Sequence, residues 1–552
     1  MTGGRVVRIA DDVREIARAD PDRVALVHAR DVPILGRSYR RYTYRELSDK
    51  AESLAVGLRR IGVGEGTLCS FMVPPCFDAV VLGVALWRVG AVIVGIEPHS
   101  HGLRRVARCL RRVGPEFFFG TPQAHAGRVV FGWGRGTIRT NVVVGPLAPP
   151  GMHTLDSLCD AREAEPVQGD VAPEDLAVIA FTTGSTGEPK PTALRHRNLA
   201  AMVALVTEHW GFVDGREIVD MPTFPMFWII GLSTGGTVVV PPMDFALKGP
   251  GDADPAKLMR TIDECGVRSM FGSPALLTNL ARYAADHGES APSLRRIICG
   301  GAEVPGPLFA AVKEMLGPDG EMYSDYGATE ALPIAEIAGD TVLGETWKAT
   351  EDGAGVCVGE PLPGVEVRIV AVDDATIASW DDAEELPAGE IGEVVARSPH
   401  ISEDYYEAPD ATAANKIPDP TGVWHRLGDT GYLDDSGRLW VCGRHSHRVV
   451  TPDGVVYPLC CEPVFNTHPA VARSALVGVD RGAGVEATLV VERSPGSGVS
   501  DDDLRRELLA VAAAHESTEL VATVVFVGRI PVDRRHNAKI DRPAIARSLA
   551  ED

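Results

Sequence analysis

Residues 181–190, FTTGSTGEPK, concentrate the residue types that bind phosphate. Two glycines, four hydroxyl side chains and one lysine lie in ten positions. Glycines let backbone N–H groups turn towards phosphate oxygens, hydroxyls add donors, and the lysine adds a positive charge. The spacing differs from a Walker A loop, in which the lysine directly follows the second glycine. The segment therefore predicts another kind of phosphate cradle; on this segment alone, a Gly/Ser/Thr surface turn remains the alternative.

Two further residues have types suited to nucleotide chemistry. Asp429 lies between glycines in GDTGYLD, where the backbone can approach a ligand and the carboxylate can accept hydrogen bonds from ribose hydroxyls. A β-turn aspartate is the alternative. Lys539, in RRHNAKIDRP, follows a predicted strand, and a solvated surface charge is the alternative there.

Read in order, these motifs resemble the superfamily of acyl-CoA synthetases, nonribosomal-peptide adenylation domains and luciferases. The series comprises TTGSTGEPK, GGAE at 300–303, YGATE at 326–330, GDTGY at 428–432, Gly443-Arg444 and NAK at 537–539. The resemblance spans nearly the whole chain. It implies an α/β adenylate-forming fold, with a large N-terminal domain of βα-built sheets plus a β subdomain (residues 1–443) and a small mobile α+β lid (residues 444–552).

The resemblance also implies the chemistry: a carboxylate attacks the α-phosphorus of Mg·ATP and forms an acyl-AMP. Lys539, Thr329 and Glu330 are the expected catalytic residues, with Glu330 holding Mg²⁺ and Lys539 swinging in from the lid. Tyr326 is expected to stack on adenine. The expected ATP and AMP contacts are Thr182, Thr183, Gly184, Ser185, Thr186, Gly187, Lys190, Gly301, Ala302, Glu303, Asp325, Tyr326, Gly327, Ala328, Asp429 and Arg444.

Segments outside the shared ATP core resemble the β-lactone synthetases of bacterial olefin biosynthesis. They are FGSPALL at 271–277, YGATEALP at 326–333, GRHSHRV at 443–449, FNTHPAV at 465–471 and RHNAK at 535–539. This branch implies that the β-hydroxyl of the substrate attacks the activated carbonyl, giving a β-lactone and AMP without coenzyme A. The alternatives are an acyl-CoA or acyl-carrier-protein ligase, and a non-catalytic nucleotide-binding homologue.

An acyl pocket is expected from the apolar stretch at 221–236 and from the FGSPALL segment. Its expected residues are Phe224, Met226, Phe227, Trp228, Gly272 and Ser273, with the interior of the core as the alternative for the aromatic ones.

Two positions depart from the superfamily pattern. Pro191 replaces the usual glycine after the loop lysine and removes an N–H, and Ser446-His447 occupy the places of a hinge lysine and acidic residue. No general base for the hydroxyl is assigned; His447 and His468 are the candidates considered.

The elements that must position these residues alternate along the chain. Residues 43–62 have helical spacing of apolar positions, and residues 80–98 predict a buried helix followed by a buried strand. The recurring βα pattern indicates a largely parallel sheet. Short β-prone pieces follow residue 355, and residues 446–552 predict strands with one amphipathic helix near 501–515.

Composition restricts the partners. A formal net charge of -22 opposes binding to nucleic acid or an anionic bilayer through a general basic field. The most apolar window contains Arg88 and is too short for a clean membrane span. Ten cysteines without a C-x-x-C pair favour reduced thiols in a cytoplasm. We therefore expect a cytoplasmic enzyme without an integral membrane segment. The resemblance to β-lactone synthetases implies a small β-hydroxy acid as substrate and other enzymes of a β-lactone or olefin pathway as partners.

Overall fold

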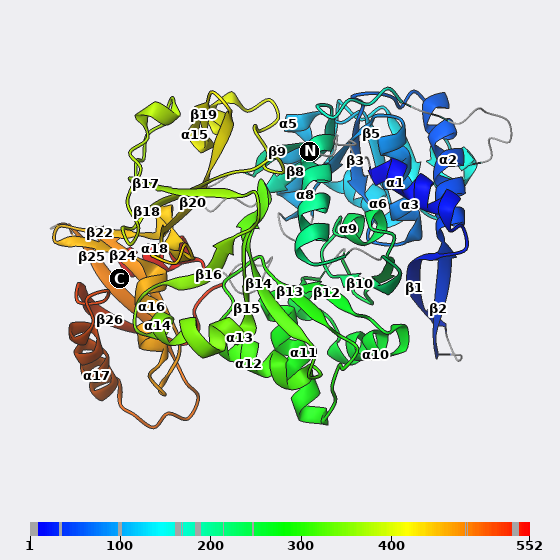
Figure 1. Ribbon diagram of the computed structural model, residues 1–552. Coiled ribbons are helices and arrows are strands. Elements are labelled where there is room, and N and C mark those ends of the chain that lie inside the picture. Colours follow the sequence, from blue (N-terminus) through cyan, green and yellow to red (C-terminus); the bar gives the residue numbers. More distant parts are fainter. Residues whose placement is uncertain are drawn as a thin grey trace.

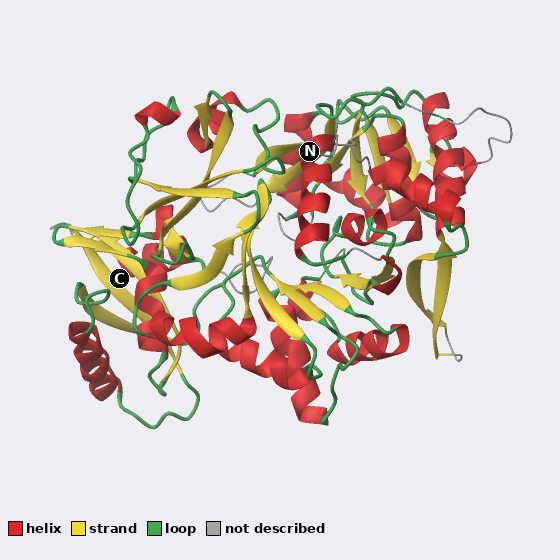
Figure 2. Ribbon diagram, in the orientation of Figure 1, coloured by secondary structure: helices red, strands yellow, loops and turns green. Residues whose placement is uncertain are grey.

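The computed structural model describes residues 9–32, 36–97, 102–159, 167, 169–182, 189–212, 215–245, 248–480, 482, 484–532 and 540–551. Helices and strands alternate through the first part of the chain, and strands dominate the middle (Figures 1 and 2). The α/β fold class expected from the sequence is confirmed. No described helix is both long enough and apolar enough to cross a membrane.

A seven-stranded sheet lies in the N-terminal third, in the order β7-β6-β5-β3-β4-β8-β9. Its neighbours pair in parallel except β8 with β9. The strands are β3 (Leu68–Met72), β4 (Val92–Gly95), β5 (Phe117–Gly120), β6 (Thr140–Val143), β7 (His153–Thr154), β8 (Leu176–Thr182) and β9 (Lys190–Arg195). The associated helices are α2 (Tyr44–Arg60), α3 (Phe77–Arg88), α5 (Leu103–Val113), α6 (Pro122–Phe131), α7 (Leu155–Cys159) and α8 (His196–His209). The predicted helix at 43–62 and the predicted helix and strand at 80–98 are thus confirmed.

A second sheet of fourteen strands runs through the middle of the molecule, in the order β17-β18-β20-β21-β16-β15-β14-β13-β12-β10-β11-β1-β2, with β19 paired to β20. The strands are β1 (Val24–Val32), β2 (Gly36–Thr43), β10 (Val219–Pro222), β11 (Thr237–Val240), β12 (Ser269–Gly272), β13 (Arg296–Cys299), β14 (Glu321–Ala328), β15 (Ala331–Ala338), β16 (Val356–Pro361), β17 (Glu366–Val370), β18 (Gly392–Arg397), β19 (Lys416–Asp419), β20 (Gly422–Leu433) and β21 (Leu439–Arg444). Its helices are α1 (Ile9–Ala19), α9 (Trp228–Ser233), α10 (Pro255–Cys265), α11 (Pro274–His287), α12 (Gly306–Met315), α13 (Gly339–Thr341), α14 (Trp347–Glu351) and α15 (Pro409–Asn415). The β-rich texture expected after residue 355 is confirmed.

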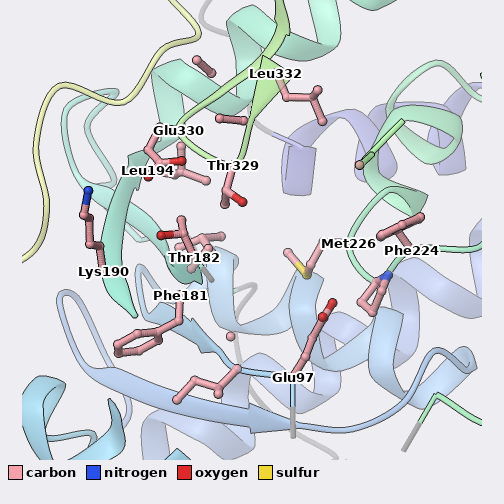
Figure 3. Close-up of a pocket in the computed structure, with 18 of the residues that line it drawn as sticks. Glu97, Phe181, Thr182, Lys190, Leu194, Phe224, Met226, Thr329, Glu330 and Leu332 are labelled. Atoms are coloured by element: carbon pink, nitrogen blue, oxygen red, sulfur yellow. The ribbon is translucent and has the colours of Figure 1, made fainter. Parts of the chain in front are cut away.

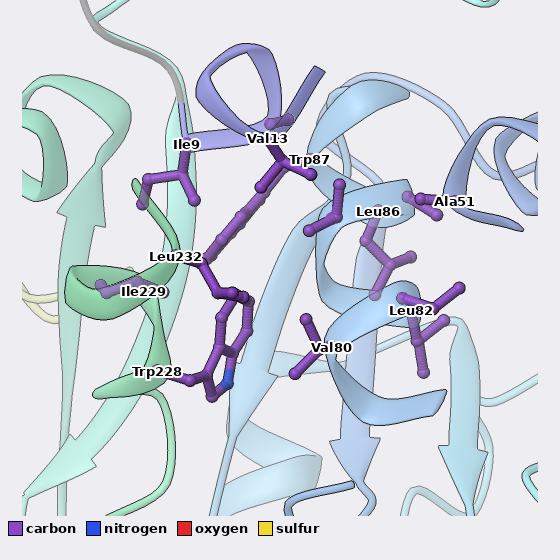
Figure 4. Close-up of a cluster of buried hydrophobic side chains, with 14 of the residues drawn as sticks. Ile9, Val13, Ala51, Val80, Leu82, Leu86, Trp87, Trp228, Ile229 and Leu232 are labelled. Carbon is purple, nitrogen blue, oxygen red and sulfur yellow. The ribbon is translucent and has the colours of Figure 1, made fainter. Parts of the chain in front are cut away.

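The two sheets are joined by a core around α3, in which every residue except Asp78 is buried. Trp87 of α3 packs against Trp228 of α9 with ring centroids 5.9 Å apart, and Figure 4 shows both among aliphatic side chains. Arg88 is buried in the same helix, where it pairs with Glu52 at 3.1 Å and donates to the Ser48 carbonyl at 2.9 Å. These partners compensate the buried charge of Arg88. The apolar window that contains Arg88 therefore belongs to the protein interior.

The C-terminal part has a three-stranded sheet with its own core. Strands β24 (Val471–Asp480), β25 (Val485–Arg493) and β26 (Val521–Val527) are adjacent in that order, and β22 (Val449–Thr451) and β23 (Gly454–Val456) form a hairpin. The helices are α16 (Pro458–Asn466), α17 (Asp501–Ala514) and α18 (Arg542–Glu551). Leu476, Leu489, Leu504 and Leu508 are buried in this core. The predicted α+β texture with one amphipathic helix near 501–515 is confirmed.

Candidate functional site

A cavity of about 1100 Å³ lies at the carboxyl ends of β3, β4, β5 and β8 and extends to the β14–β15 hairpin and to β20–β21. Ligand sites in open α/β sheets commonly lie at this edge, where loops rather than paired strands face the crevice. Figure 3 shows Thr329 and Glu330 near Thr182 and Lys190, with Met226 and Phe224 further across the cavity. The cavity therefore brings a polar end and an apolar region into one continuous space.

The polar end begins where β8 and β9 meet. Thr182, the last residue of β8, is in register with Lys190, the first residue of β9, and both line the cavity. The Lys190 Nζ donates to Asn415 Oδ1 at 3.0 Å and lies 5.5 Å from the centroid of the Tyr405 ring. Burial lowers the pKa of Lys190, partly offset by the nearby Glu330 carboxylate. An ammonium held in a partly desolvated cavity interacts strongly with a phosphate.

Thr329 and Glu330 form the two-residue connection between β14 and β15, because Ala328 pairs with Ala331. This hairpin projects both side chains into the cavity. Glu330 is buried and accepts a hydrogen bond from the Tyr405 hydroxyl at Oε1, over 2.7 Å. The carboxylate is thus held in one orientation beside the polar end.

Tyr326, Asp429 and Arg444 form a hydrogen-bonded group next to this hairpin. The Tyr326 hydroxyl donates to Asp429 Oδ2 at 2.8 Å, and Arg444 Nε lies 3.1 Å from Asp429 Oδ1. Arg444 also donates to the Leu427 carbonyl at 3.0 Å. The Asp429 carboxylate raises the pKa of Arg444, and burial raises the pKa of Tyr326 well above its usual value. The register pair Asp429–Arg444 across β20 and β21 explains why residues fifteen positions apart meet.

The remaining expected nucleotide residues are distributed around this end. Gly301, Gly327 and Ala328 line the cavity, whereas Ala302 and Glu303 lie on the loop after β13 outside that lining. Asp325 is buried beside Gly300 and Glu336, and its Oδ1 has no hydrogen-bond partner among the described residues. Thr183, Gly184, Ser185, Thr186, Gly187 and Lys539 lie outside the described residues.

The stretch before α9 forms one apolar wall. Phe224, Met226, Phe227 and Trp228 line the cavity, and the Phe227 ring stacks on Phe271 with centroids 4.4 Å apart. Trp228 also belongs to the core described above, so it has both of the roles weighed for it from the sequence. Gly272 and Ser273 do not appear in the lining, although Phe271 does. The Ser273 hydroxyl instead caps α11 by accepting from the Leu276 N–H at 3.3 Å, because serine at an N-cap satisfies an otherwise unpaired donor.

A second group of lining residues is not predicted by the sequence. The apolar region continues past β4 to α5 and α6. Its walls include Phe71 of β3, Ile96 just after β4, Phe131 at the end of α6 and Trp133 just after it. Figure 3 shows Glu97, just after β4, extending into the cavity. The segment VGIEP at 94–98 contains two of these lining residues, Ile96 and Glu97. An apolar run of this kind is equally typical of a core strand, and only the tertiary structure distinguishes a cavity wall from the core.

Tyr405 and His425 also line the cavity without having been predicted from the sequence, and the unpredicted Lys416 lies beside the Tyr405 ring. Lys416 is buried, donates to the Ser402 carbonyl and lies 5.7 Å from the centroid of the Tyr405 ring. Burial lowers the pKa of Lys416 to about 7, and burial together with Lys416 lowers the pKa of His425 well below its usual value. A lysine and a histidine on two neighbouring strands, β19 and β20, give no distinctive sequence pattern, so periodicity could not reveal them.

At the junction with the C-terminal part, two side chains next to Ser446 and His447 contact the exposed Asp374 carboxylate. His445 Nε2 lies 2.8 Å from Asp374 Oδ1, and Arg448 contacts the same carboxylate at 3.1 Å. Ser446 lines the cavity.

Two further positions singled out in the sequence lie elsewhere. His468 Nε2 lies 3.1 Å from Glu507 Oε2 of helix α17, in the C-terminal part. Pro191 pairs with Phe181 in the β8–β9 ladder, and its carbonyl accepts from the Tyr406 N–H at 2.8 Å.

Comparisons with known proteins agree with this architecture. The chain is 39% identical over 560 residues to an olefin beta-lactone synthetase of Stenotrophomonas maltophilia, with 98% of each chain covered. It is 37% identical to an olefin beta-lactone synthetase of Xanthomonas campestris, covering 98% of this chain and 96% of that protein. The amide bond synthetase McbA of Marinactinospora thermotolerans superposes with a TM-score of 0.78 at 25% identity, covering 98% of this chain and 99% of that one. ATP-bound MatB of Rhodopseudomonas palustris has the same fold, with a TM-score of 0.76 at 21% identity and the same coverage.

Residues 13–406 match the family described as AMP-binding enzyme, which is well over half of the chain. The polar end of the cavity and the two sheets that form it lie mainly within or next to these residues. The chain therefore belongs to the AMP-binding enzymes and is an adenylate-forming ligase.

Proposed function

We propose that this ligase activates a β-hydroxy acid as its acyl-AMP and then closes it to a β-lactone, releasing AMP and pyrophosphate. The observation that carries the proposal is the similarity, over 98% of the chain, to two proteins named olefin beta-lactone synthetase. The cavity supports it, because one continuous space offers both a polar end for a nucleotide and an apolar region for an acid.

In the first half-reaction, a carboxylate oxygen of the substrate attacks the α-phosphorus of ATP and pyrophosphate leaves. We assign Lys190, Thr182 and Thr329 to the phosphates, and Asp429 with Arg444 to the ribose, with Tyr326 beside the base. Holding both reactants in one orientation removes much of the entropic barrier. Lys539 is assigned to the charge that develops between carboxylate and α-phosphate, and the loop residues 183–187 to the pyrophosphate.

Glu330 is the residue that would hold Mg²⁺. No cluster of three or more histidine, cysteine or acidic side chains with metal-binding geometry occurs among the described residues. A single oriented carboxylate fits a Mg²⁺ that takes its other ligands from phosphate oxygens and water. The ion would neutralise phosphate charge, while Tyr405 keeps the carboxylate oriented.

In the second half-reaction, the β-hydroxyl oxygen attacks the acyl carbon, and the bond from that carbon to the AMP oxygen breaks. AMP takes the bonding electron pair, and the hydroxyl proton passes to a base. Because the nucleophile belongs to the same molecule, its effective concentration is high and no thiol is required. Exclusion of water from the apolar region protects the adenylate from hydrolysis.

We further propose that residues 444–552 act as a lid. Residues from Val449 onwards have a separate core, while β21 continues through Arg444 as part of the large sheet. The contacts of His445 and Arg448 with Asp374 then lie at the pivot. We place the enzyme in the cytoplasm, alongside the enzymes that supply the hydroxy acid and consume the lactone.

A thioester-forming ligase shares the first half-reaction, so the test must separate the second. The protein is incubated with Mg·ATP and β-hydroxy acids of several chain lengths, or with the matching acids that lack the hydroxyl, without any thiol. The proposal predicts AMP only with the hydroxy acids, and a product lighter than the acid by one water. AMP that appears only after coenzyme A or a carrier protein is added would assign a thioester ligase, and no acyl-AMP with any acid would indicate a non-catalytic homologue.

A further inference from the structure

Helix α5 presents a row of arginines on an otherwise acidic protein. Residues 102–139 contain eight arginines and one acidic residue, Glu116, whereas the whole chain has a formal net charge of -22. Arg104, Arg105, Arg111 and Arg112 are exposed on α5, while Val106, Leu110 and Val113 on its other face are buried against the sheet. The helix therefore shows a cationic face to solvent that composition alone conceals.

Helix α6, beside it, exposes an uncharged stripe. Val129 and Val130 are 71% and 73% exposed, although valine is usually buried in folded proteins. Pro122, Gln123 and Ala126 are also exposed at helical spacing on this face. Leu103 at the start of α5 and Leu147 after β6 are 41% and 80% exposed, so half of the eight large apolar side chains found exposed in the described part lie in this region.

The same two helices form the far wall of the cavity. Leu103, Ala124, Gly127, Phe131 and Trp133 line it, and the Trp133 indole N–H donates to the Leu103 carbonyl at 2.8 Å, which ties the helices together. Three strand spacings, about 14 Å, separate β8, which ends at the polar end of the cavity, from β5, which leads into α6. Exposed apolar side chains thus sit directly outside the apolar end of the substrate cavity.

We propose that the α5–α6 face docks on an anionic lipid bilayer and takes its apolar acid from there. The arginines would bind lipid phosphates, and Val129 and Val130 would enter the interface between headgroups and acyl chains. The geometry favours a bilayer over an acidic carrier protein, because a carrier would have to deliver a thiol at the polar end. The inference rests on the proposed function only in taking the acid to be apolar.

The test is sedimentation of the full-length protein with vesicles of phosphatidylcholine alone, or of equal parts phosphatidylcholine and phosphatidylglycerol. One variant combines Arg104→Gln, Arg105→Gln, Arg111→Gln and Arg112→Gln, and a second combines Val129→Ser and Val130→Ser. The matched controls are Arg59→Gln with Arg60→Gln at the exposed end of α2, and Val450→Ser with Val455→Ser on the lid hairpin. None of these residues lines the cavity.

The proposal predicts binding to the anionic vesicles alone, weakened at least about tenfold by the arginine variant and by a rise in ionic strength. The valine variant should also weaken binding, while both controls bind as the parent does and all variants keep AMP formation from a short, water-soluble acid. Absence of vesicle binding, or binding unchanged in the arginine variant, would overturn the proposal. Binding of an acyl carrier protein in place of vesicles, through the same arginines, would also overturn it. Because sedimentation needs no catalysis, its failure is distinct from failure of the proposed reaction.

Discussion

The Tyr326 hydroxyl donates to Asp429 Oδ2 at 2.8 Å, joining two motifs that lie more than one hundred residues apart. Arg444 completes the group from the next strand at 3.1 Å from the other carboxylate oxygen. Asp429 therefore organises this group: it accepts from the Tyr326 hydroxyl, balances the charge of Arg444 and is the acceptor that we propose for the ribose.

We expect Asp429→Asn to impair nucleotide use more than folding. The substitution keeps the shape but leaves Arg444 without its counter-charge and weakens the acceptor, at a cost of about 2–3 kcal/mol. The kcat/KM for ATP should fall about 30- to 150-fold. Asp435→Asn, in the exposed turn that follows β20, is the matched control and should behave as the parent does. An unchanged kcat/KM for ATP in Asp429→Asn would remove Asp429 from the site.

Tyr405→Phe should raise the Mg²⁺ concentration needed for half-maximal AMP formation. The hydroxyl that holds Glu330 Oε1 at 2.7 Å is lost, and loss of such an orienting partner weakens metal binding by about 10- to 100-fold. Titration of Mg²⁺ at saturating ATP measures the effect. Tyr406→Phe changes the neighbouring residue, which does not line the cavity, and should leave the Mg²⁺ dependence unchanged. Equal Mg²⁺ dependence in the two variants would contradict the role given to Tyr405.

Gly95→Leu should restrict the enzyme to acids with shorter chains. Gly95 ends β4 and lines the cavity, and a Cβ added there meets no atom within 4 Å. The leucine side chain can thus enter the apolar region without disturbing the backbone. The kcat/KM for long-chain acids should fall by about tenfold or more, while short acids are processed as before. Gly344→Leu, another position open around its Cβ, is the control. A parallel loss for acids of every length would indicate misfolding of the sheet edge instead.

Lys416 should make stability rise with pH in the alkaline range. Its pKa in the folded state is about 7, whereas a lysine in the unfolded chain titrates near 10.5. Between these values the unfolded state binds more protons, so the free energy of unfolding increases by about 1.4 kcal/mol per pH unit. Lys416→Met has no ammonium group at this position and therefore loses this pH dependence. The difference in urea midpoint between parent and variant should therefore shift in favour of the parent from pH 7 to pH 9, and a constant difference would contradict the depressed pKa.

Much of the fold could be predicted from the sequence because its signals are local. The helix at 43–62, the buried helix and strand at 80–98 and the α+β texture of the C-terminal part follow from apolar periodicity. The group around Asp429 depends on pairing between distant strands, and Tyr405 and Lys416 lie on segments with no recognisable motif. Gly272 and Ser273 were expected in the pocket from the FGSPALL segment, yet neither lines the cavity and Ser273 caps the N-terminus of α11. Contacts of this kind are determined by tertiary packing, which periodicity does not encode.

The central claim, activation followed by internal closure, is tested most directly with a β-hydroxy acid carrying ¹⁸O in both carboxylate oxygens. With Mg·ATP and no thiol, the account predicts AMP with one ¹⁸O, and a lactone with ¹⁸O in the carbonyl and the unlabelled hydroxyl oxygen in the ring. Unlabelled AMP would contradict adenylation. Labelled AMP with only the open acid recovered, carrying an oxygen from solvent, would contradict lactone closure.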